Sequence, residues 1–278
     1  MIARPTSDPA AFKQLALPLL QGDPVLNTAI LSNTEDRIRG ILADPEPPLF
    51  VSVHDGDEVI GAIVCTALRG VNLGSLRTGL VPVVADLLAE RSPRAIGVSG
   101  PAEAADLFAR LYSARTGRSF RESERSRLHK LGGIVEQKAD GAPRPATGTD
   151  VVALAPMVGA YRAEVGHGAE GEAEDRRWLE QRIERRRLWV WEDEGRLVSM
   201  VGHQSPVFGT VRVGPVYTPP ESRGRGYASA LTAEVSRRLR EAGDEVCLFT
   251  DLANPTSNKI YAAIGYRPVQ DFTGYAFS

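Results

Sequence analysis

Two stretches of the chain share one pattern of apolar and polar positions. In residues 48–67, an apolar run meets an acidic turn that contains glycine, and a second apolar run follows. Residues 187–203 repeat this order around the turn Asp193-Glu194-Gly195. Short apolar runs joined by such a turn are typical of a β-hairpin. The sequence therefore predicts one hairpin in each half.

A second feature also occurs once in each half. Around residues 111–120 and again around 260–269, an apolar stretch reaches a glycine and continues as a β-prone run. This pattern is typical of a helix that stops before a new strand. Because both features come in the same order, we expect a duplicated domain with an α+β fold.

A stretch rich in Pro, Gly and Ala separates the two halves. Residues 137–150 have no apolar periodicity, as is usual for a linker. The halves have about 137 and 129 residues, each near the usual domain size. We expect domains at residues 1–137 and 151–278, joined by a linker at 138–150.

The second half permits a finer prediction. Helices are expected over residues 155–165, 172–186, 227–241 and 255–264. Strands are expected over residues 188–192, 197–204, 210–218, 245–250, 266–269 and 274–277. Asn254 is a suitable N-cap for the last helix, and Gly265 suits its end.

The most informative segment joins the strand at 210–218 to the helix at 227–241. It passes two prolines and then reads Arg-Gly-Arg-Gly at residues 223–226. Glycine lets backbone N–H groups turn toward an anion, and the helix N-terminus adds the positive end of its dipole. Together with the two arginines, this arrangement suits a pyrophosphate.

Other phosphate-binding loops fit this segment less well. A P-loop needs Gly-Lys-Ser/Thr, which is absent. Gly224, Gly226, Ser229 and Asp251 approximate a dinucleotide-binding fold. However, residues 218–223 separate the strand from the first glycine, and too few residues follow Asp251 to complete such a sheet. A glycine-rich turn that binds no ligand is the remaining alternative.

At this loop the chain resembles motif A of the GNAT superfamily, the acetyl-CoA-dependent N-acetyltransferases. The motif is Gln/Arg-x-x-Gly-x-Gly/Ala, and Arg223, Gly226 and Ala228 match it. A second pattern of the family places an Asn before the last helix, a Tyr within it, and Gly with an aromatic residue after it. That pattern is matched by Asn254, Tyr261, Gly265 and Tyr266. The resemblance covers about residues 149–278, and the first half is similar only in outline.

The resemblance implies two GNAT-like domains, each a mostly antiparallel twisted sheet flanked by helices. It also implies a role for each matching position. Pantetheine would lie like an added strand along the backbone of Val216, Tyr217 and Thr218. The pyrophosphate would lie on the backbone amides of Arg223, Gly224, Arg225, Gly226, Tyr227 and Ala228. Asn254 and Asn258 would face pantetheine, and Tyr261 would protonate the leaving CoA thiolate.

Helical spacing agrees with part of this assignment. Asn254, Asn258 and Tyr261 share one face of the expected helix, while Ile260 and Ile264 share another that can serve the core. A tyrosine that only packs is the alternative for Tyr261.

A proline inside the strand at 210–218 marks a further feature. Proline cannot donate to a strand ladder, so Gly214-Pro215 indicates a bulge or an edge. The family separates its fourth and fifth strands at a bulge to admit the thioester. We therefore expect an opening beside these two residues, with an ordinary strand-start proline as the alternative.

No acid stands where many family members carry the general base. An amine must lose a proton to react, yet residues 210–218 contain no Asp or Glu. His203 is the candidate substitute, and a structural histidine is the alternative. His167 and Glu164 are weaker candidates. The arginine-rich run at 182–187 is expected to be a solvated helix face, with binding of an acidic substrate as the alternative.

The first half has no counterpart to the glycine-arginine loop. Gly70, Gly74 and Gly79 are too far apart to form the same nest. We expect a degenerate domain without a cofactor, which shapes the acceptor pocket at the interface. A second active site is the alternative.

Composition narrows the function classes. The net charge of −2 gives no basic excess for nucleic acid, and no apolar run reaches the length of a membrane helix. No spacing of His and Cys predicts a metal site. Cys65 and Cys247 lie in apolar runs and are expected to be buried free thiols of a cytoplasmic protein. A homodimer stays open.

These observations predict an N-acetyltransferase that transfers the acetyl group of acetyl-CoA to a small-molecule amine. A protein or peptide N-acetyltransferase is one alternative. A non-catalytic acyl-CoA sensor is another, because a binding loop alone does not establish turnover.

Overall fold

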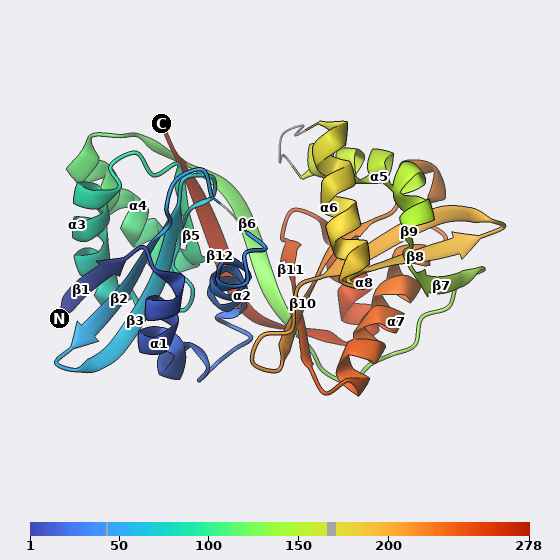
Figure 1. Cartoon of the computed structure of the whole chain (residues 1–278), viewed down its shortest axis with the longest axis horizontal. Coiled ribbons are helices and arrows are strands. Elements are labelled where there is room, and N and C mark those ends of the chain that lie inside the picture. Colours follow the sequence, from blue (N-terminus) through green and yellow to red (C-terminus); the bar gives the residue numbers. More distant parts are fainter. Residues whose placement is uncertain (43, 166–170) are drawn as a thin grey trace.

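One continuous sheet runs through the whole molecule (Figure 1). The computed structural model describes residues 1–42, 44–165 and 171–278. Twelve strands follow the order β1-β2-β3-β4-β5-β12-β6-β11-β10-β9-β8-β7. The pairs β4–β5 and β10–β11 are parallel, and the other neighbours are antiparallel. The predicted mixed fold with a mostly antiparallel sheet is confirmed.

The order of helices and strands is the same in both halves, which confirms the predicted duplication. The first half contains β1 (Ile2–Thr6), α1 (Pro9–Leu20), α2 (Thr28–Ile38), β2 (Leu49–Asp55), β3 (Glu58–Thr66), β4 (Gly70–Asn72), α3 (Val81–Arg91), β5 (Gly97–Pro101), α4 (Ala102–Thr116) and β6 (Phe120–Leu131). The second half contains β7 (Ala142–Pro145), α5 (Val151–Glu164), α6 (Glu172–Glu184), β8 (Leu188–Asp193), β9 (Arg196–His203), β10 (Thr210–Tyr217), α7 (Tyr227–Glu241), β11 (Glu245–Asp251), α8 (Pro255–Ile264) and β12 (Tyr266–Phe277).

The two halves exchange their last strands. The end of β6, Ser126 to Lys130, lies between β11 and β12 in the second half. In return, Phe272 to Ala276 of β12 pair with β5 of the first half. β6 and β12 also pair with each other along their length, in the middle of Figure 1. Neither half therefore completes its sheet from its own residues.

One prediction about this region is wrong. The strands expected at 266–269 and 274–277 are a single strand, β12, with register shifts on the way. The expected linker contributes β7, which pairs with β8 as the outer strand of the second half. A strand that pairs with both domains needs no turn where it passes from one to the other. In the sequence, its two ends therefore look like two separate strands.

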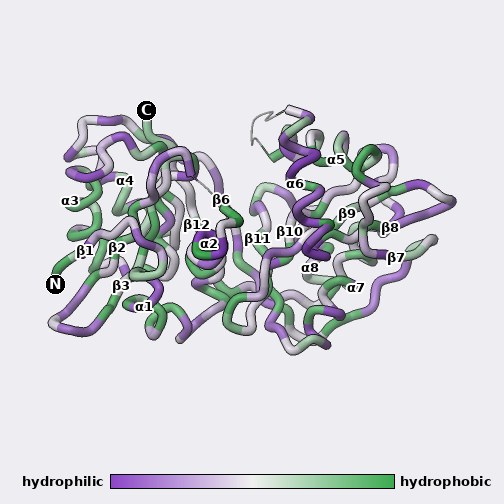
Figure 2. Tube along the Cα trace, viewed as in Figure 1, coloured by the Kyte–Doolittle hydropathy of each residue, from purple (hydrophilic) through white to green (hydrophobic). Residues whose placement is uncertain are grey.

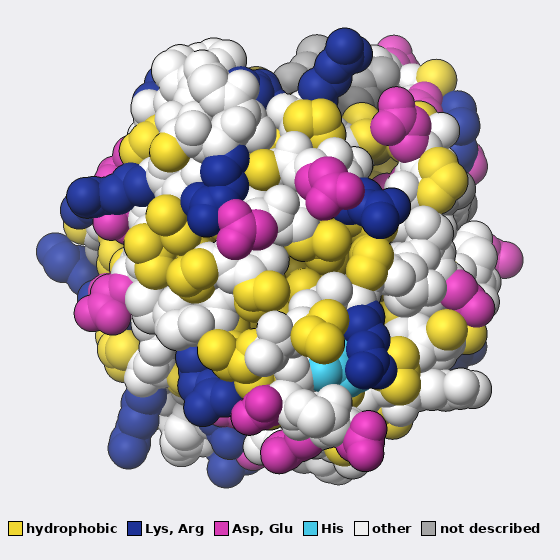
Figure 3. All heavy atoms as spheres, turned by 90° about the vertical axis from the view of Figure 1, so that its left-hand side faces the viewer, with side chains coloured by type: hydrophobic (Ala, Val, Ile, Leu, Met, Phe, Trp, Pro, Cys, Tyr) yellow, Lys and Arg dark blue, Asp and Glu magenta, His cyan; other side chains and the backbone are white. Residues whose placement is uncertain are grey.

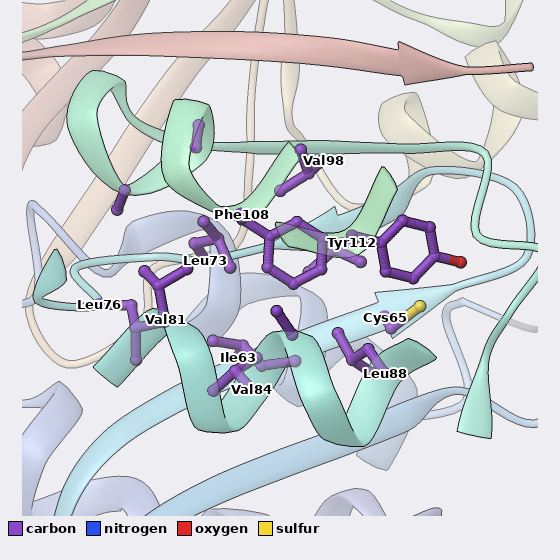
Figure 4. Packing of buried hydrophobic residues seen from close by; sticks show 14 of the residues in the cluster. Ile63, Cys65, Leu73, Leu76, Val81, Val84, Leu88, Val98, Phe108 and Tyr112 are labelled. Carbon is purple, nitrogen blue, oxygen red and sulfur yellow. The ribbon is translucent and has the colours of Figure 1, made fainter. Parts of the chain in front are cut away.

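Helices cover both faces of the sheet. In the first half, α3 and α4 pack on one face, and Figure 4 shows Leu88, Phe108 and Tyr112 within this cluster. In the second half, α7 and α8 share one face with residues of β8 to β11. The helices α5 and α6 cover the opposite face. Residues on the two faces of β8 alternate accordingly, as a pleated strand requires.

Local sequence sets the ends of the last helix. The side chain of Asn254 accepts a hydrogen bond from the Ser257 amide at 3.0 Å, as its predicted N-cap role requires. Gly265 ends α8 with a φ of 110°. These two residues place Tyr261 on the inner side of α8, where it packs with Ile264 in the core. Ile260 is partly buried and packs against the same cluster, so Tyr261 shares the core with the two isoleucines that were expected there.

Charges of both signs are mixed on the face of the molecule shown in Figure 3. On the face shown in Figure 3, side chains of Lys and Arg alternate with those of Asp and Glu around apolar areas. Within the described ranges no helix is long and apolar enough to cross a membrane. Cys65 and Cys247 are both buried free thiols, as predicted.

Candidate active site

Strands β10 and β11 separate after three paired residues. Their parallel pairing covers Thr210 to Arg212, opposite Glu245 to Cys247. From Val213 onward, β10 pairs only with β9, and its register shifts between Val213 and Val216. The predicted bulge at Gly214-Pro215 is therefore present. It leaves the β11 side of Val216 and Tyr217 without a strand partner, as a ligand added along the strand would need.

A cluster of unoccupied amides lies at the start of α7. No described residue accepts a hydrogen bond from the backbone amides of residues 224–229. Gly224 and Gly226 have φ values of 79° and 84°, which direct successive N–H groups to one side. The dipole of α7 adds positive potential at the same place. These amides can bind the oxygens of a diphosphate.

Arg223 does not belong to this amide cluster, contrary to expectation. Its amide donates to the Pro220 carbonyl at 3.2 Å. Its guanidinium donates to both carboxylate oxygens of Glu164 on α5, at 2.7 and 2.9 Å. This bidentate pair ties the loop to α5 on the opposite face of the sheet. It also occupies Glu164, which argues against that residue as the general base.

Tyr227 and Arg225 flank the same helix start. The Tyr227 ring is buried, and its hydroxyl donates to Asp193 at 2.5 Å, so only its amide is available to a ligand. Arg225 is exposed, and a hydrogen bond with Tyr227 raises the pKa of its guanidinium. Arg225 is therefore the cation of this loop that is free to move toward a phosphate.

Tyr261 of α8 is buried on the α7 side of the sheet. Its side chain is 8% exposed and belongs to the buried cluster that includes residues of β10 and β11. Its ring lies edge-on to Tyr266, with 6.0 Å between centroids. Its hydroxyl has no hydrogen-bond partner in the described part of the chain, whereas Tyr266 bonds Ser236 at 2.7 Å. Burial raises the Tyr261 pKa, so the phenol keeps its proton at neutral pH.

The side chains of Asn254 and Asn258 form hydrogen bonds at the start of α8. Asn258 donates to the carbonyls of Asp251 and Asn254 at 3.1 and 2.9 Å. Together with the Asn254 cap, these bonds hold the β11–α8 turn. Both residues thus shape the loop beside the opening, and any contact with pantetheine would use their remaining polar atoms.

His203 is buried beside the bulge. It stands opposite Val213, and its Nδ1 lies 2.9 Å from the Gln204 carbonyl, which can only accept a hydrogen bond. Nδ1 is therefore the donor, and Nε2 of the neutral ring carries the lone pair. Burial is the main cause of a pKa below 6.5, so the ring is neutral at pH 7. His167 lies outside the described residues.

Two residues near the opening escaped the sequence analysis. Tyr161 of α5 lies edge-on to Tyr217, and it is close enough to raise the pKa of Tyr261 further. Gln137 accepts a hydrogen bond from Ser229, so the segment after β6 crosses the start of α7. Tyr161 could have been found from its place on the inner side of helix 155–165. No sequence signal links Gln137 to α7.

The corresponding place in the first half is filled by leucines. The Leu73 amide donates to Ser99, which continues the β4–β5 ladder past Asn72. Leu73, Leu76 and Leu80 from the segment after β4 are buried in the core. Figure 4 shows Leu73 and Leu76 with Phe108 in this cluster. β4 and β5 thus stay hydrogen-bonded at the position where β10 and β11 separate.

Among the described residues no group of three His, Cys, Asp or Glu side chains is placed to hold a metal ion.

Comparisons with known proteins show what part of the chain, and what fold, is shared with others. Residues 195–273 match the family model described as FR47-like protein. This range runs from the β8–β9 turn into β12 and contains the amide cluster and Tyr261. No curated protein matches the chain by sequence.

Solved structures share the fold over the whole chain. A GNAT-family acetyltransferase from Colwellia psychrerythraea has a TM-score of 0.64 at 11% identity, with 100% of both chains covered. A GCN5-related N-acetyltransferase from Sphaerobacter thermophilus has a TM-score of 0.61 at 18% identity, covering 99% of this chain and 94% of that one. A tandem GNAT protein from the clavulanic acid biosynthesis pathway has 0.57 at 13%, covering 99% and 97%. The chain thus has the tandem GNAT fold.

Proposed function

We propose that this protein is an N-acetyltransferase that moves the acetyl group of acetyl-CoA to a small-molecule amine. The observation that carries the proposal is the split between β10 and β11, which has the free amides of residues 224–229 at one end and Tyr261 in the buried cluster that includes residues of both strands. A long thioester with a diphosphate fits this combination. Pantetheine would extend along β10, and the diphosphate would lie on the amides.

Each step of the transfer has a candidate group. The amine nitrogen attacks the thioester carbon, and a backbone N–H of Val216 or Tyr217 binds the oxyanion that forms. The C–N bond forms, the C–S bond breaks, and the CoA thiolate takes the proton of Tyr261. His203, neutral and buried, takes the proton that the amine nitrogen loses, directly or through water.

The first half supports a small acceptor over a protein. The helix α2 lies between the two halves (Figure 1) and contacts β10, so the face of the sheet opposite α7 is covered. An extended polypeptide would need an open groove there. We assign the first half a shaping role without a cofactor of its own, because leucines fill the place of its loop.

Calorimetry with acetyl-CoA, followed by release of free CoA thiol with a broad amine panel, tests the proposal. The expected result is binding at one site per chain and thiol release with one class of small amines. Binding without release from any amine would instead support the acyl-CoA sensor, and absence of binding would contradict both functions.

A further inference from the structure

Four arginines lie at the seam between the halves. Arg212 is the last residue of β10 that pairs with β11, and Arg182 lies on α6. Arg187 follows α6, and its carbonyl accepts the His203 amide at 3.1 Å. Arg69 comes from the β3–β4 turn of the first half and is close enough to lower the pKa of Arg212. We call Arg69, Arg182, Arg187 and Arg212 the seam arginines.

The seam arginines lie on the opposite side of the sheet from the diphosphate amides. Arg212 stands across from Cys247, whose side chain packs with Val25 and Phe272 near α2. The neighbouring Val213 and Val246 point the other way, into the cluster under α7. Arg212 therefore does not face the amides at the start of α7. An anion bound at the seam would be separate from the phosphates of CoA.

Arg182 lies directly beside the bulge. Its guanidinium stacks on Trp178, with 4.4 Å to the ring centroid, and donates to the His203 carbonyl at 2.8 Å. A Cβ on Gly202 would come within 3.3 Å of Arg182 Nη1 and within 3.1 Å of Pro215. Arg182 and Pro215 are thus close neighbours across Gly202. The absence of a side chain at position 202 lets the guanidinium approach the opening.

No ion pair within the described residues neutralises the seam arginines. In the described ranges no carboxylate lies within 4.0 Å of any seam arginine. The Arg212 guanidinium makes no hydrogen bond to a described residue, although its side chain is partly buried. Asp36 of α2 is the acid that acts on Arg182, Arg187 and Arg212, and it accepts a hydrogen bond from Ser205.

Burial of Arg182 and Arg212 affects both their pKa values and the free energy of keeping them charged. It lowers the pKa of Arg182 to about 10 and also lowers that of Arg212, so both remain charged at neutral pH. Partly buried cations that lack a paired carboxylate are costly, and an anionic ligand reduces that cost. Figure 2 shows α6 as mostly hydrophilic, yet Arg182 and the following Arg187 are only partly exposed. The expectation of a solvated arginine face over 182–187 is therefore wrong for these two residues.

We propose that the acceptor amine carries a carboxylate, as an amino acid does, and that Arg212 and Arg182 bind it at the seam. This inference rests on the proposed N-acetyltransferase function and specifies its substrate class. The planar guanidinium fork matches two carboxylate oxygens. With the carboxylate held beside Pro215, the amine of the same molecule reaches the opening where the thioester carbon would lie. Arg69 and Arg187 add to the field that attracts the anion.

Matched acceptor pools test the proposal on the full chain. One pool contains the proteinogenic amino acids, and the other contains the same compounds as carboxamides, each assayed by release of CoA thiol. We expect the amino acids to react with a kcat/KM that is higher on the order of 10- to 100-fold. Arg212→Gln should abolish this preference, and Arg212→Lys should restore part of it. Arg94→Gln, an exposed arginine of the first half, is the control and should keep the preference.

The outcomes separate this inference from the proposed function. Calorimetry should show that Arg212→Gln binds acetyl-CoA like the wild type, and a thermal melt checks that it is folded. Equal rates for the two pools, thiol release only with amines that lack a carboxylate, or an unchanged preference in Arg212→Gln would each overturn the carboxylate site while leaving N-acetyl transfer intact. Absence of acetyl-CoA binding in the wild type would overturn both.

Discussion

Arg212 of β10 and Cys247 of β11 are the last opposed residues of a parallel strand pair that opens immediately beyond them. On one side of this point stands the arginine-rich seam, and on the other the strand backbone has no partner. The same two strands of the first half stay hydrogen-bonded past Asn72 through the Leu73 amide. One duplicated fold thus contains an open and a closed version of the same strand pair.

Gly226→Ala should weaken acetyl-CoA binding by about tenfold or more. Gly226 has a φ of 84°, and a Cβ would lie 3.2 Å from the Lys138 carbonyl. A side chain there costs about 1–2 kcal/mol of backbone strain and turns the amides away. Gly243→Ala at the other end of α7 is the control, because its φ is 97° but nothing lies within 4 Å. Calorimetry that showed equal losses in both variants would contradict a phosphate role for residues 224–229.

Tyr261→Phe should lower kcat by about 100-fold and leave the acetyl-CoA Kd nearly unchanged. The hydroxyl that would protonate the thiolate is removed, but the buried ring stays in place. Tyr266→Phe is the matched control in the same aromatic pair. It loses the bond to Ser236 and about 1 kcal/mol of stability, with kcat retained. Equal kcat for Tyr261→Phe and the wild type would assign Tyr261 to packing alone.

The pH dependence of kcat/KM should have its acidic limb below pH 6.5. A neutral His203 is needed as base, and burial lowers its pKa, so the neutral form persists as the pH falls through 6.5. Protonation at still lower pH then removes activity. In His203→Gln the limb should disappear together with about 100-fold of the rate. A variant with the wild-type rate and profile would show that His203 only holds the β9–β10 structure.

Phe108→Ala in the first half should destabilise the second half as well. Phe108 is fully buried and stacks on Tyr112, so its loss costs about 3–5 kcal/mol. Because the halves exchange β6 and β12, this loss should reach both. All three tryptophans, Trp178, Trp189 and Trp191, lie in the second half and report its unfolding. Their fluorescence midpoint in urea should fall in Phe108→Ala and stay near the wild-type value for the exposed Leu68→Ala. An unchanged midpoint in Phe108→Ala would mean that the halves unfold independently.

Much of the fold could be predicted from short-range patterns. The hairpin β8–β9, the helix α7 behind its glycines and the caps of α8 each depend on residues close in sequence, so their signals are local. Strand exchange depends on pairing between residues 120–131 and 266–277, and no local pattern encodes which domain receives a strand. The extent of the twelve-stranded sheet therefore emerged only from the structure.

The candidate site likewise has parts that local sequence predicts and parts that depend on residues far apart in the chain. Gly214-Pro215 predicted the bulge because proline breaks a ladder wherever it stands. In contrast, the Arg223–Glu164 pair joins residues that are far apart in the chain, so no local pattern could have shown that the Arg223 side chain is held by α5. Arg182 and Arg187 likewise come under the charge of Asp36 on α2 of the other half, and residues 182–187 alone resemble any charged helix end.

A crystal structure of the full chain with CoA tests the central claim most directly. The account predicts diphosphate oxygens about 3 Å from backbone amides of residues 224–229, and pantetheine along Val216 and Tyr217 with its sulfur near the Tyr261 hydroxyl. CoA bound in the first half, or bound with the start of α7 uncontacted, would contradict it.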